Sequence, residues 1–205
     1  MSAKYIVKIL TLGDTSVGKS SIVLRFSDDD FNDNQFATIG IDFKTKYIKM
    51  GDSSVKVLIW DTAGQEKFQN IAKQYYKGAN GVLLIYDIGN KKSFERVDFW
   101  LKELKSNNRI EELFICLVGN KIDLEDKRVI STEDGEKYAK ENNINFFEVS
   151  AKSGKGVNDL FNAAIKGSMD KVFSSNEKEE GDDNVKLSSF LDKGEFKQEN
   201  KRCCF

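Results

Sequence analysis

The 205-residue chain contains neither histidine nor proline. The absence of histidine excludes Ser-His-Asp and Cys-His nucleophile systems, histidine-ligated metal ions and a histidine general base. The absence of proline excludes PxxP ligands and linkers stiffened by proline. Any chemistry that the chain performs at neutral pH therefore depends on carboxylates, amides, hydroxyls, lysines and the backbone.

The chain also has no large excess of positive or negative charge, no long apolar run and few cysteines. The formal net charge is −1, so no overall basic field indicates a nucleic-acid partner. No stretch approaches the ~18 apolar residues of a membrane span, and the first residues lack the apolar region of a signal peptide. Three cysteines are too few for a disulfide framework, which favours a cytosolic location.

Short apolar runs alternate with amphipathic stretches along most of the chain. Apolar runs at 5–12, 82–86 and 114–118 are typical of strands buried on both faces, and a further strand is expected at 145–149. Helical spacing is found at 19–26, 92–106, 131–142 and 157–172, and residues 43–50 and 55–60 predict an antiparallel hairpin. This order predicts an α/β fold: a six-stranded, mostly parallel sheet with one antiparallel strand, flanked by about five helices.

The composition changes after Phe173. Residues 174–205 carry eight acidic and six basic side chains and show no sustained periodicity. Such a segment cannot bury a core, so we expect a flexible tail with a root-mean-square reach of roughly 30 Å. The sequence thus predicts one domain over residues 1–173 and a tail over residues 174–205.

Residues 13–20 read Gly-Asp-Thr-Ser-Val-Gly-Lys-Ser and match GxxxxGK[ST] between a predicted strand and a predicted helix. The two glycines let the backbone curl so that its N–H groups point at phosphate oxygens, and the helix N-terminus adds partial positive charge. Lys19 would reach the outer phosphates, and the Ser20 hydroxyl would bind Mg²⁺. The alternative, a glycine turn beside a surface lysine, is disfavoured by the strand–loop–helix context.

Residues 61–65, Asp-Thr-Ala-Gly-Gln, follow the predicted strand 55–60. Asp61 could hold Mg²⁺ through water, and the Gly64 N–H would be free for a γ-phosphate. Gln65 could orient the attacking water, since the chain has no histidine to act as a base. Alone, a DxxG pattern is usually a turn, but downstream of a P-loop it predicts a second element on the metal side.

Residues 120–123, Asn-Lys-Ile-Asp, follow the predicted strand 114–118. The Asp123 carboxylate can accept hydrogen bonds from the N1–H and the exocyclic amine of guanine, and adenine offers no such pair. The Lys121 stem could cover the base while Asn120 ties loops together. In a chain rich in Asn and Lys, the same four residues could also be an ordinary loop.

Ser150-Ala151-Lys152, after the predicted strand 145–149, is a weaker signal, in which the Ala151 N–H would face guanine O6. The four motifs lie in order at the carboxyl ends of four predicted strands. An open α/β sheet binds its ligand at this edge. The sequence therefore predicts a guanine-nucleotide site there.

With these motifs the chain resembles small GTPases of the Ras superfamily, and specifically the Rab branch, over about residues 4–173. The Rab-like stretches are 37–43 (ATIGIDF), 59–68 (IWDTAGQEKF), 75–79 (YYKGA) and 84–88 (LIYDI). The resemblance implies the P-loop NTPase fold of small G proteins. It also implies slow hydrolysis of GTP to GDP and phosphate, with Mg²⁺ as cofactor.

The resemblance further implies residue roles that spacing alone does not supply. Mg²⁺ would be bound by Ser20, Thr38 and Asp61, and catalysis would depend on Gln65 and Lys19. Guanine nucleotide would contact Asp14, Thr15, Ser16, Val17, Gly18, Lys19, Ser20, Ser21, Phe31, Thr38, Gly64, Asn120, Lys121, Asp123, Ser150, Ala151 and Lys152. Effectors would bind a patch made of Ile41, Phe43, Trp60 and Tyr75. Thr15 and Ser16 depart from the Ser and Gly of many relatives, which could alter intrinsic hydrolysis.

These inferences give the hypothesis of a monomeric two-state switch in vesicle transport. GTP and Mg²⁺ would order the segments around Thr38 and 64–76, and hydrolysis would release them. Neither segment contains an arginine, so a partner protein should accelerate hydrolysis by roughly 10³–10⁵. Two alternatives stay open: an ATP-using P-loop kinase or ATPase, which Asp123 disfavours, and a nucleotide-locked scaffold, which Gln65 disfavours.

The terminal sequence Lys-Arg-Cys-Cys-Phe does not match the C-a-a-X pattern. Cys203 and Cys204 resemble the paired cysteines of Rab tails, which are geranylgeranylated; the alternative is two exposed thiols. Stable membrane anchoring would need both lipids, because one lipid chain binds membranes weakly. The tail has a formal charge of −2, so it cannot supply a polybasic segment as the second membrane-binding signal. Cys116 is instead expected in a strand core.

The resemblance also implies partners and a location. The partners would be an exchange factor, a GTPase-activating protein, an escort protein or GDP-dissociation inhibitor, and effectors, but no nucleic acid. The chain would lie on the cytoplasmic face of intracellular or plasma membranes, with a soluble pool bound to the inhibitor.

Overall fold

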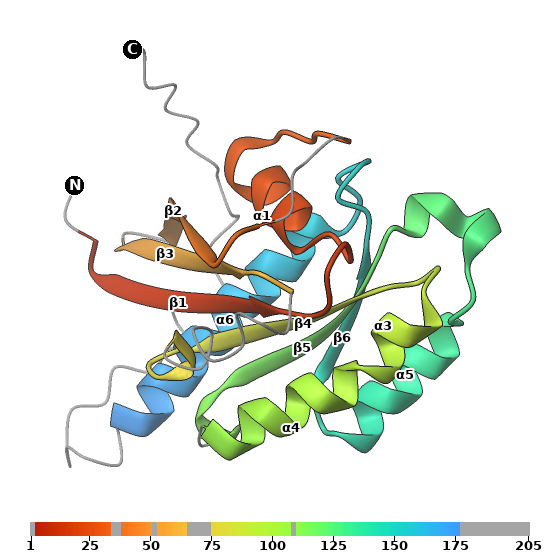
Figure 1. Ribbon diagram of the computed structural model, residues 1–205. Helices are drawn as coiled ribbons and strands as arrows, with labels where there is room; N and C mark the ends of the chain where they lie inside the picture. Colours follow the sequence, from red (N-terminus) through yellow and green to blue (C-terminus); the bar gives the residue numbers. More distant parts are fainter. Residues whose placement is uncertain (1–2, 34–37, 51–52, 65–74, 108–109, 177–205) are drawn as a thin grey trace.

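The computed structural model describes residues 3–33, 38–50, 53–64, 75–107 and 110–176. Its centre is a six-stranded sheet in the order β2-β3-β1-β4-β5-β6 (Figure 1). The strands are β1 (Tyr5–Leu12), β2 (Ile41–Met50), β3 (Ser53–Thr62), β4 (Gly81–Asp87), β5 (Phe114–Asn120) and β6 (Asn145–Val149). The α-helices in the described ranges are α1 (Lys19–Asp28), α3 (Lys91–Glu95), α4 (Val97–Asn107), α5 (Thr132–Glu141) and α6 (Val157–Asn176), with short 3-10 helices η2 (Ile110–Glu112) and η3 (Ile122–Lys127).

All neighbouring strands run parallel except β2 and β3, which form the predicted antiparallel hairpin. The predicted α/β fold with one antiparallel strand is therefore confirmed. In the β1–β3 pair the register runs from Tyr5 opposite Val55 to Thr11 opposite Asp61. Because the two strands end level, the loop after β1 and the segment after β3 leave the sheet side by side.

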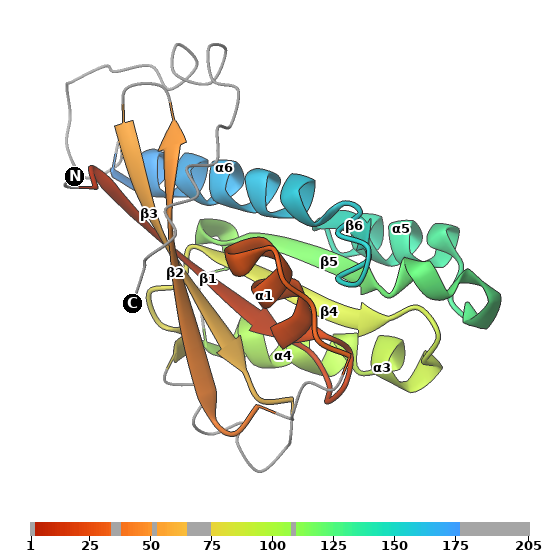
Figure 2. The ribbon, with the colours of Figure 1, turned by 90° about the horizontal axis from the view of Figure 1, so that it is seen from above.

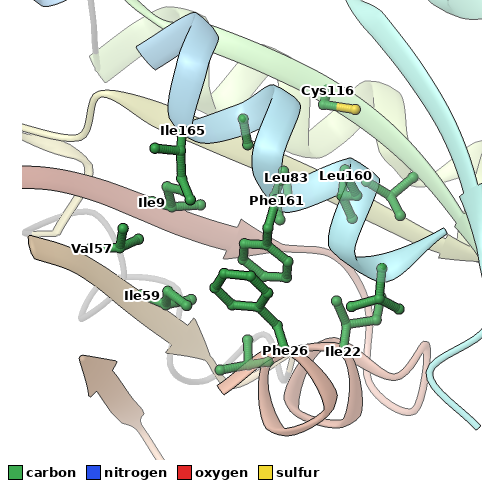
Figure 3. Close-up of a cluster of buried hydrophobic side chains, with 14 of the residues drawn as sticks. Ile9, Ile22, Phe26, Val57, Ile59, Leu83, Cys116, Leu160, Phe161 and Ile165 are labelled. Carbon is green, nitrogen blue, oxygen red and sulfur yellow. The ribbon is translucent and has the colours of Figure 1, made fainter. Parts of the chain in front are cut away.

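Helices cover both faces of the sheet. On one face, α1 and α6 pack over β1, β3, β4 and β5 around a buried core that includes the stacked rings of Phe26 and Phe161, 3.9 Å apart (Figure 3). Cys116 belongs to this core, as expected, and burial raises the pKa of its thiol. On the other face, α4 contributes Trp100 and Leu104 to a second core (Figure 2 shows α1 in front of the strands and α4 behind them).

The helix predicted over 92–106 is divided in the structure. α3 ends at Glu95 and α4 begins at Val97, with Arg96 as the residue between them. The break falls where the Arg96 side chain turns toward the loop after β1. Ser131 is the N-cap residue of α5, because its side chain accepts a hydrogen bond from the Asp134 N–H at 3.1 Å.

α6 continues to Asn176, three residues beyond the predicted domain boundary at Phe173. Residues 177–205, which make up most of the predicted tail, lie outside the described ranges. Among the helices that the structure describes, none has the length and apolar character needed to cross a membrane.

Candidate functional site

The loop between β1 and α1, residues 13–18, wraps the N-terminus of α1. Gly18 is the N-cap residue of this helix, in the left-handed region at φ 94°, and as a glycine it supplies no side-chain cap. A Cβ on Gly18 would collide with the Asn120 side-chain amide, so only glycine fits there. The N-terminus of a helix attracts anions, in agreement with the phosphate-binding role predicted for this loop.

Lys19 lies under this loop and is only 5% exposed. Its ammonium group donates to the carbonyl oxygens of Gly13 at 2.9 Å and Asp14 at 2.7 Å. Burial lowers the pKa of Lys19 to about 8, against the opposing effect of the Asp61 and Asp14 charges. Among the residues that the structure describes, no carboxylate lies at hydrogen-bond distance from this buried ammonium group, which suits it to a phosphate anion.

Ser20, Thr38 and Asp61 meet beside Lys19. Ser20 Oγ lies 2.6 Å from Thr38 Oγ1 and donates to the Asp61 carboxylate, and Thr38 Oγ1 donates to the same carboxylate oxygen at 3.2 Å. Asp61 is 4% exposed, and burial raises its pKa against the opposing effects of these hydroxyls and Lys19. Hydroxyl and carboxylate oxygens are hard donors of the kind that Mg²⁺ prefers, so the three residues fit the metal role predicted for them.

Gly64 follows β3 and lies directly against the loop after β1. A Cβ at Gly64 would collide with the backbone of Asp14 and Thr15. The Gly64 backbone can approach this closely only because it carries no side chain. The predicted catalytic residue Gln65 lies outside the described residues.

Asn120 connects the two halves of the site. Its side chain is 1% exposed, donates to the Val17 carbonyl at 2.9 Å and accepts from the Ala151 N–H at 3.2 Å. One side chain thus joins the loop after β1, the end of β5 and the loop after β6. Lys121 adds a second link, because its ammonium group contacts the Ser16 carbonyl at 2.8 Å and the Asp87 carboxylate at 2.7 Å.

Asp123 and Ser150 form the next contact in this half. Ser150 is fully buried and its hydroxyl donates to Asp123 Oδ1 at 2.6 Å. The same hydroxyl accepts from the Ser153 N–H at 3.0 Å. Ser150 therefore orients the carboxylate that was predicted to recognise guanine, rather than lining the pocket itself.

The predicted nucleotide residues surround one pocket of about 470 Å³. All of them line it except Asp14, Val17 and Ser150. The full lining is Thr15, Ser16, Gly18, Lys19, Ser20, Ser21, Phe31, Asn32, Asp33, Thr38, Thr62, Gly64, Asn120, Lys121, Asp123, Leu124, Ala151 and Lys152. Asn32, Asp33, Thr62 and Leu124 were not predicted, although each except Asp33 adjoins a predicted residue in the chain.

Two arginines that support the site were not recognised from the sequence. Arg25 of α1 donates from Nε to the Ala151 carbonyl at 2.9 Å and from Nη2 to the Lys152 carbonyl at 3.0 Å. Arg96 donates from Nε to the Asp14 carboxylate at 3.0 Å. Both contacts join residues far apart in the chain, so no local pattern could have revealed them.

The predicted effector patch lies on the β2–β3 hairpin and the segment before β4. The Phe43 ring stacks on Trp60 at 5.5 Å, and Trp60 lies 4.7 Å from Tyr75. Phe43 is 57% exposed, and Ile41 begins β2 two residues before it. Three of the four predicted residues therefore form a continuous aromatic surface. Cys203 and Cys204, predicted lipid attachment points, lie outside the described residues.

Comparison with known proteins matches residues 8–170 of the chain to the Ras family. The chain is 40% identical over 199 residues to the Ras-related protein Rab-13 of Mesocricetus auratus, covering 96% of this chain and 95% of that protein. It is 40% identical over 204 residues to the GTP-binding protein ypt2 of Schizosaccharomyces pombe, covering 99% and 98% of the two chains. It is 47% identical over 154 residues to the Ras-related protein Rab-10 of Diplobatis ommata, covering 75% and 76%.

Proposed function

The chain belongs to the Ras family as a Rab-type small GTPase, and from this premise we propose that it is a Mg²⁺-dependent GTP/GDP switch anchored to membranes in vesicle transport. The observation that carries the proposal is the construction of the pocket. Its phosphate end holds Lys19 and the helix N-terminus, and its other end holds the Asp123 carboxylate, which is suited to guanine. Asn120 connects the two ends.

Recognition of guanine would depend on Asp123 and the Ala151 N–H. Asp123 would accept from the two donors on the guanine edge, while Ser150 holds one carboxylate oxygen in place. Adenine lacks this donor pair, so an adenine base would leave the carboxylate unpaired. In the present structure the Ala151 N–H donates to Asn120, and binding of a base would have to share or replace that bond.

Hydrolysis would depend on residues at the phosphate end. Lys19 would hold the outer phosphates, and the Gly64 N–H would bind the γ-phosphate. Gln65 would orient the attacking water. Ser20, Thr38 and Asp61 would hold Mg²⁺, which when bound neutralises charge that develops on the phosphates. Thr38 and Gly64 would sense the γ-phosphate, so its loss would release the segments that carry them.

Turnover should be slow without a partner protein, because the segments around Thr38 and 64–76 carry no arginine to stabilise the transition state. Exchange factors, activating proteins, a GDP-dissociation inhibitor and effectors would act on the switch. Effectors would bind the aromatic surface of Phe43, Trp60 and Tyr75. This surface combines exposed ring area with the edge of a rigid sheet, which is typical of binding sites for proteins.

Membrane attachment would come from geranylgeranyl groups on Cys203 and Cys204. A single lipid chain binds membranes marginally, and the acidic tail supplies no electrostatic second signal. Intact mass of the protein from a eukaryotic cell should show two prenyl additions. Loss of both additions is expected for Cys203→Ser/Cys204→Ser. Unmodified cysteines in the wild-type protein would disprove the anchor.

Release of the nucleotide from denatured, purified protein tests the central proposal. Guanine nucleotide is expected in near-stoichiometric amount, and adenine nucleotide would instead support a P-loop kinase or ATPase. Single-turnover GTP hydrolysis then separates a switch from a nucleotide-locked scaffold. Gln65→Leu should slow hydrolysis strongly and leave GDP affinity unchanged; an unchanged rate would remove the role assigned to Gln65.

A further inference from the structure

The Asp14 carboxylate is held from behind by two residues at the start of α4. Arg96 Nε and Trp100 Nε1 each donate to Asp14 Oδ1, and each distance is 3.0 Å. Trp100 is 2% exposed and packed in the core, whereas the Arg96 and Asp14 side chains are 34% and 23% exposed. Asp14 is thus tied to a rigid element on the side away from the pocket.

The Arg96 side chain is itself held in a defined position. Its guanidinium lies over the Phe99 ring, with Cζ 4.9 Å from the ring centroid. Its backbone N–H donates to the Lys92 carbonyl at 3.0 Å, and its carbonyl accepts from the Trp100 N–H at 3.2 Å. A planar guanidinium stacked on an aromatic ring loses little freedom when it makes a directed hydrogen bond.

The backbone of Asp14 touches two groups on the pocket side. Its carbonyl accepts from the Lys19 ammonium group at 2.7 Å, and its peptide lies against Gly64 so closely that a Cβ there would collide with it. Lys19 is also held by the Gly13 carbonyl and by its place in α1. The Gly64 backbone, by contrast, packs directly against the Asp14–Thr15 peptide.

We propose that Arg96 is a positioning residue for GTP hydrolysis. Its hydrogen bond to the Asp14 carboxylate holds in place the Asp14–Thr15 peptide, against which the Gly64 backbone packs. The inference depends on the proposed function, in which the Gly64 N–H binds the γ-phosphate. Without Arg96, Asp14 keeps the Trp100 hydrogen bond but loses its cationic partner, and its peptide gains freedom to rotate. The Gly64 N–H then spends less time in the position that the reaction requires.

The expected signature is a loss of rate without a matching loss of binding. Misplacement of a reacting group by about 1 Å can lower a reaction rate by up to about 100-fold. Loss of the Arg96 hydrogen bond only loosens the position of Gly64, so the rate of GTP hydrolysis should fall less, by about tenfold. GDP lacks the γ-phosphate that Gly64 would contact. Its dissociation rate should therefore change less than about twofold when Arg96 is altered.

The test uses Arg96→Met, which keeps an unbranched side chain over Phe99 and removes the donor. Single-turnover hydrolysis of GTP, the dissociation rate of a fluorescent GDP and the melting temperature are measured on the full-length chain. We expect hydrolysis about tenfold slower, GDP dissociation unchanged within about twofold and partial recovery of hydrolysis in Arg96→Lys. The charge-matched control is Lys102→Met, on the exposed side of α4, which should behave as wild type.

A double-mutant cycle shows whether Arg96 acts through Asp14. Asp14→Ala removes the oxygen that accepts from both Arg96 and Trp100. In this background Arg96→Met should add no further slowing, because Arg96 no longer has a hydrogen-bond acceptor in the side chain of residue 14. Full additional slowing would overturn the inference, as would a wild-type rate in Arg96→Met or an equal loss of hydrolysis and GDP binding in Arg96→Lys.

The wild-type rate in the same assay tests the proposed function separately. A wild-type chain that releases no phosphate from bound GTP overturns the proposed function, and the inference fails with it. A wild-type chain that hydrolyses GTP at the rate of Arg96→Met overturns only the role of Arg96.

Discussion

The two ends of the pocket are built in different ways. The phosphate end comes largely from one continuous segment, residues 13–20, whose conformation follows from two glycines and a helix N-terminus. The base end is assembled from the loops after β5 and β6, which meet only through side chains such as Asn120 and Ser150. The phosphate end is formed by one short segment and the base end by contacts between distant loops. The two ends should therefore respond differently to single substitutions.

Each end of the pocket is also supported by one arginine that is not part of the pocket lining. Arg25 supports the base end through the carbonyls of Ala151 and Lys152, and Arg96 supports the phosphate end through the Asp14 carboxylate. The first holds backbone carbonyls of a loop; the second holds a side chain whose peptide faces Gly64. Substitution of the first should affect retention of nucleotide, and substitution of the second should affect hydrolysis.

The largest effect is expected at the phosphate end from Lys19→Met. The variant loses the buried ammonium group that is proposed to bind the phosphates, and charged hydrogen bonds contribute about 1.5–3 kcal/mol each. GTP affinity should fall at least about 100-fold, as measured by isothermal titration on nucleotide-free protein. Preference for guanine over adenine should persist, because Asp123 is unchanged. Lys91→Met, on the exposed surface of α3, is the control.

Gly64→Ala should separate hydrolysis from binding. The added Cβ collides with the backbone of Asp14 and Thr15, so residue 64 must move away from the loop. Single-turnover hydrolysis should fall by about 10- to 100-fold, whereas GDP affinity should change little. If hydrolysis were unaffected, the contact between Gly64 and the loop would have no part in the reaction.

Arg25→Met should weaken nucleotide retention at the base end without affecting hydrolysis. The variant removes the hydrogen bonds to Ala151 and Lys152, which leaves the loop after β6 without its link to α1. Dissociation of GDP should accelerate about fivefold, in line with the loss of about 1 kcal/mol from a hydrogen-bonded support. The rate constant for hydrolysis of bound GTP should stay within about twofold of wild type.

The exposed residue Lys137 of α5 provides a charge-matched control for Arg25. Lys137→Met should leave both GDP dissociation and hydrolysis unchanged. If Arg25→Met slowed hydrolysis but did not accelerate GDP release, the assignment of nucleotide retention to the base end and of hydrolysis to the phosphate end would be contradicted.

Ser16→Gly should produce the smallest effect. Ser16 adopts a left-handed conformation at φ 64°, which costs a residue with a Cβ about 1–2 kcal/mol. Glycine removes that cost but adds about 0.4–1 kcal/mol of unfolded-chain entropy. The free energy of unfolding in urea should therefore rise by about 0.5 kcal/mol. Thr15→Gly, at the neighbouring position without a positive φ, should lower it instead.

Much of the fold could be predicted because its signals are local. The apolar run at 5–12 and the strand expected at 145–149 coincide with β1 and β6, and a serine caps α5. Hydrophobic periodicity and capping act over a few residues, so a sequence window contains the cause. The contact of Arg96 with Asp14 was not predicted, because it joins residues 82 positions apart in the chain.

The sequence by itself determined the family, a mostly parallel sheet with one antiparallel strand, and most of the residues that surround the pocket. These follow from patterns that the chain carries within short segments. Only the tertiary structure decided that Ser150 lies behind Asp123, that Asn120 joins both ends of the pocket, and that Arg25 and Arg96 support opposite ends of it. The physical reason is that a hydrogen bond between distant residues depends on where the packed sheet and helices place them, and no spacing along the chain encodes that position.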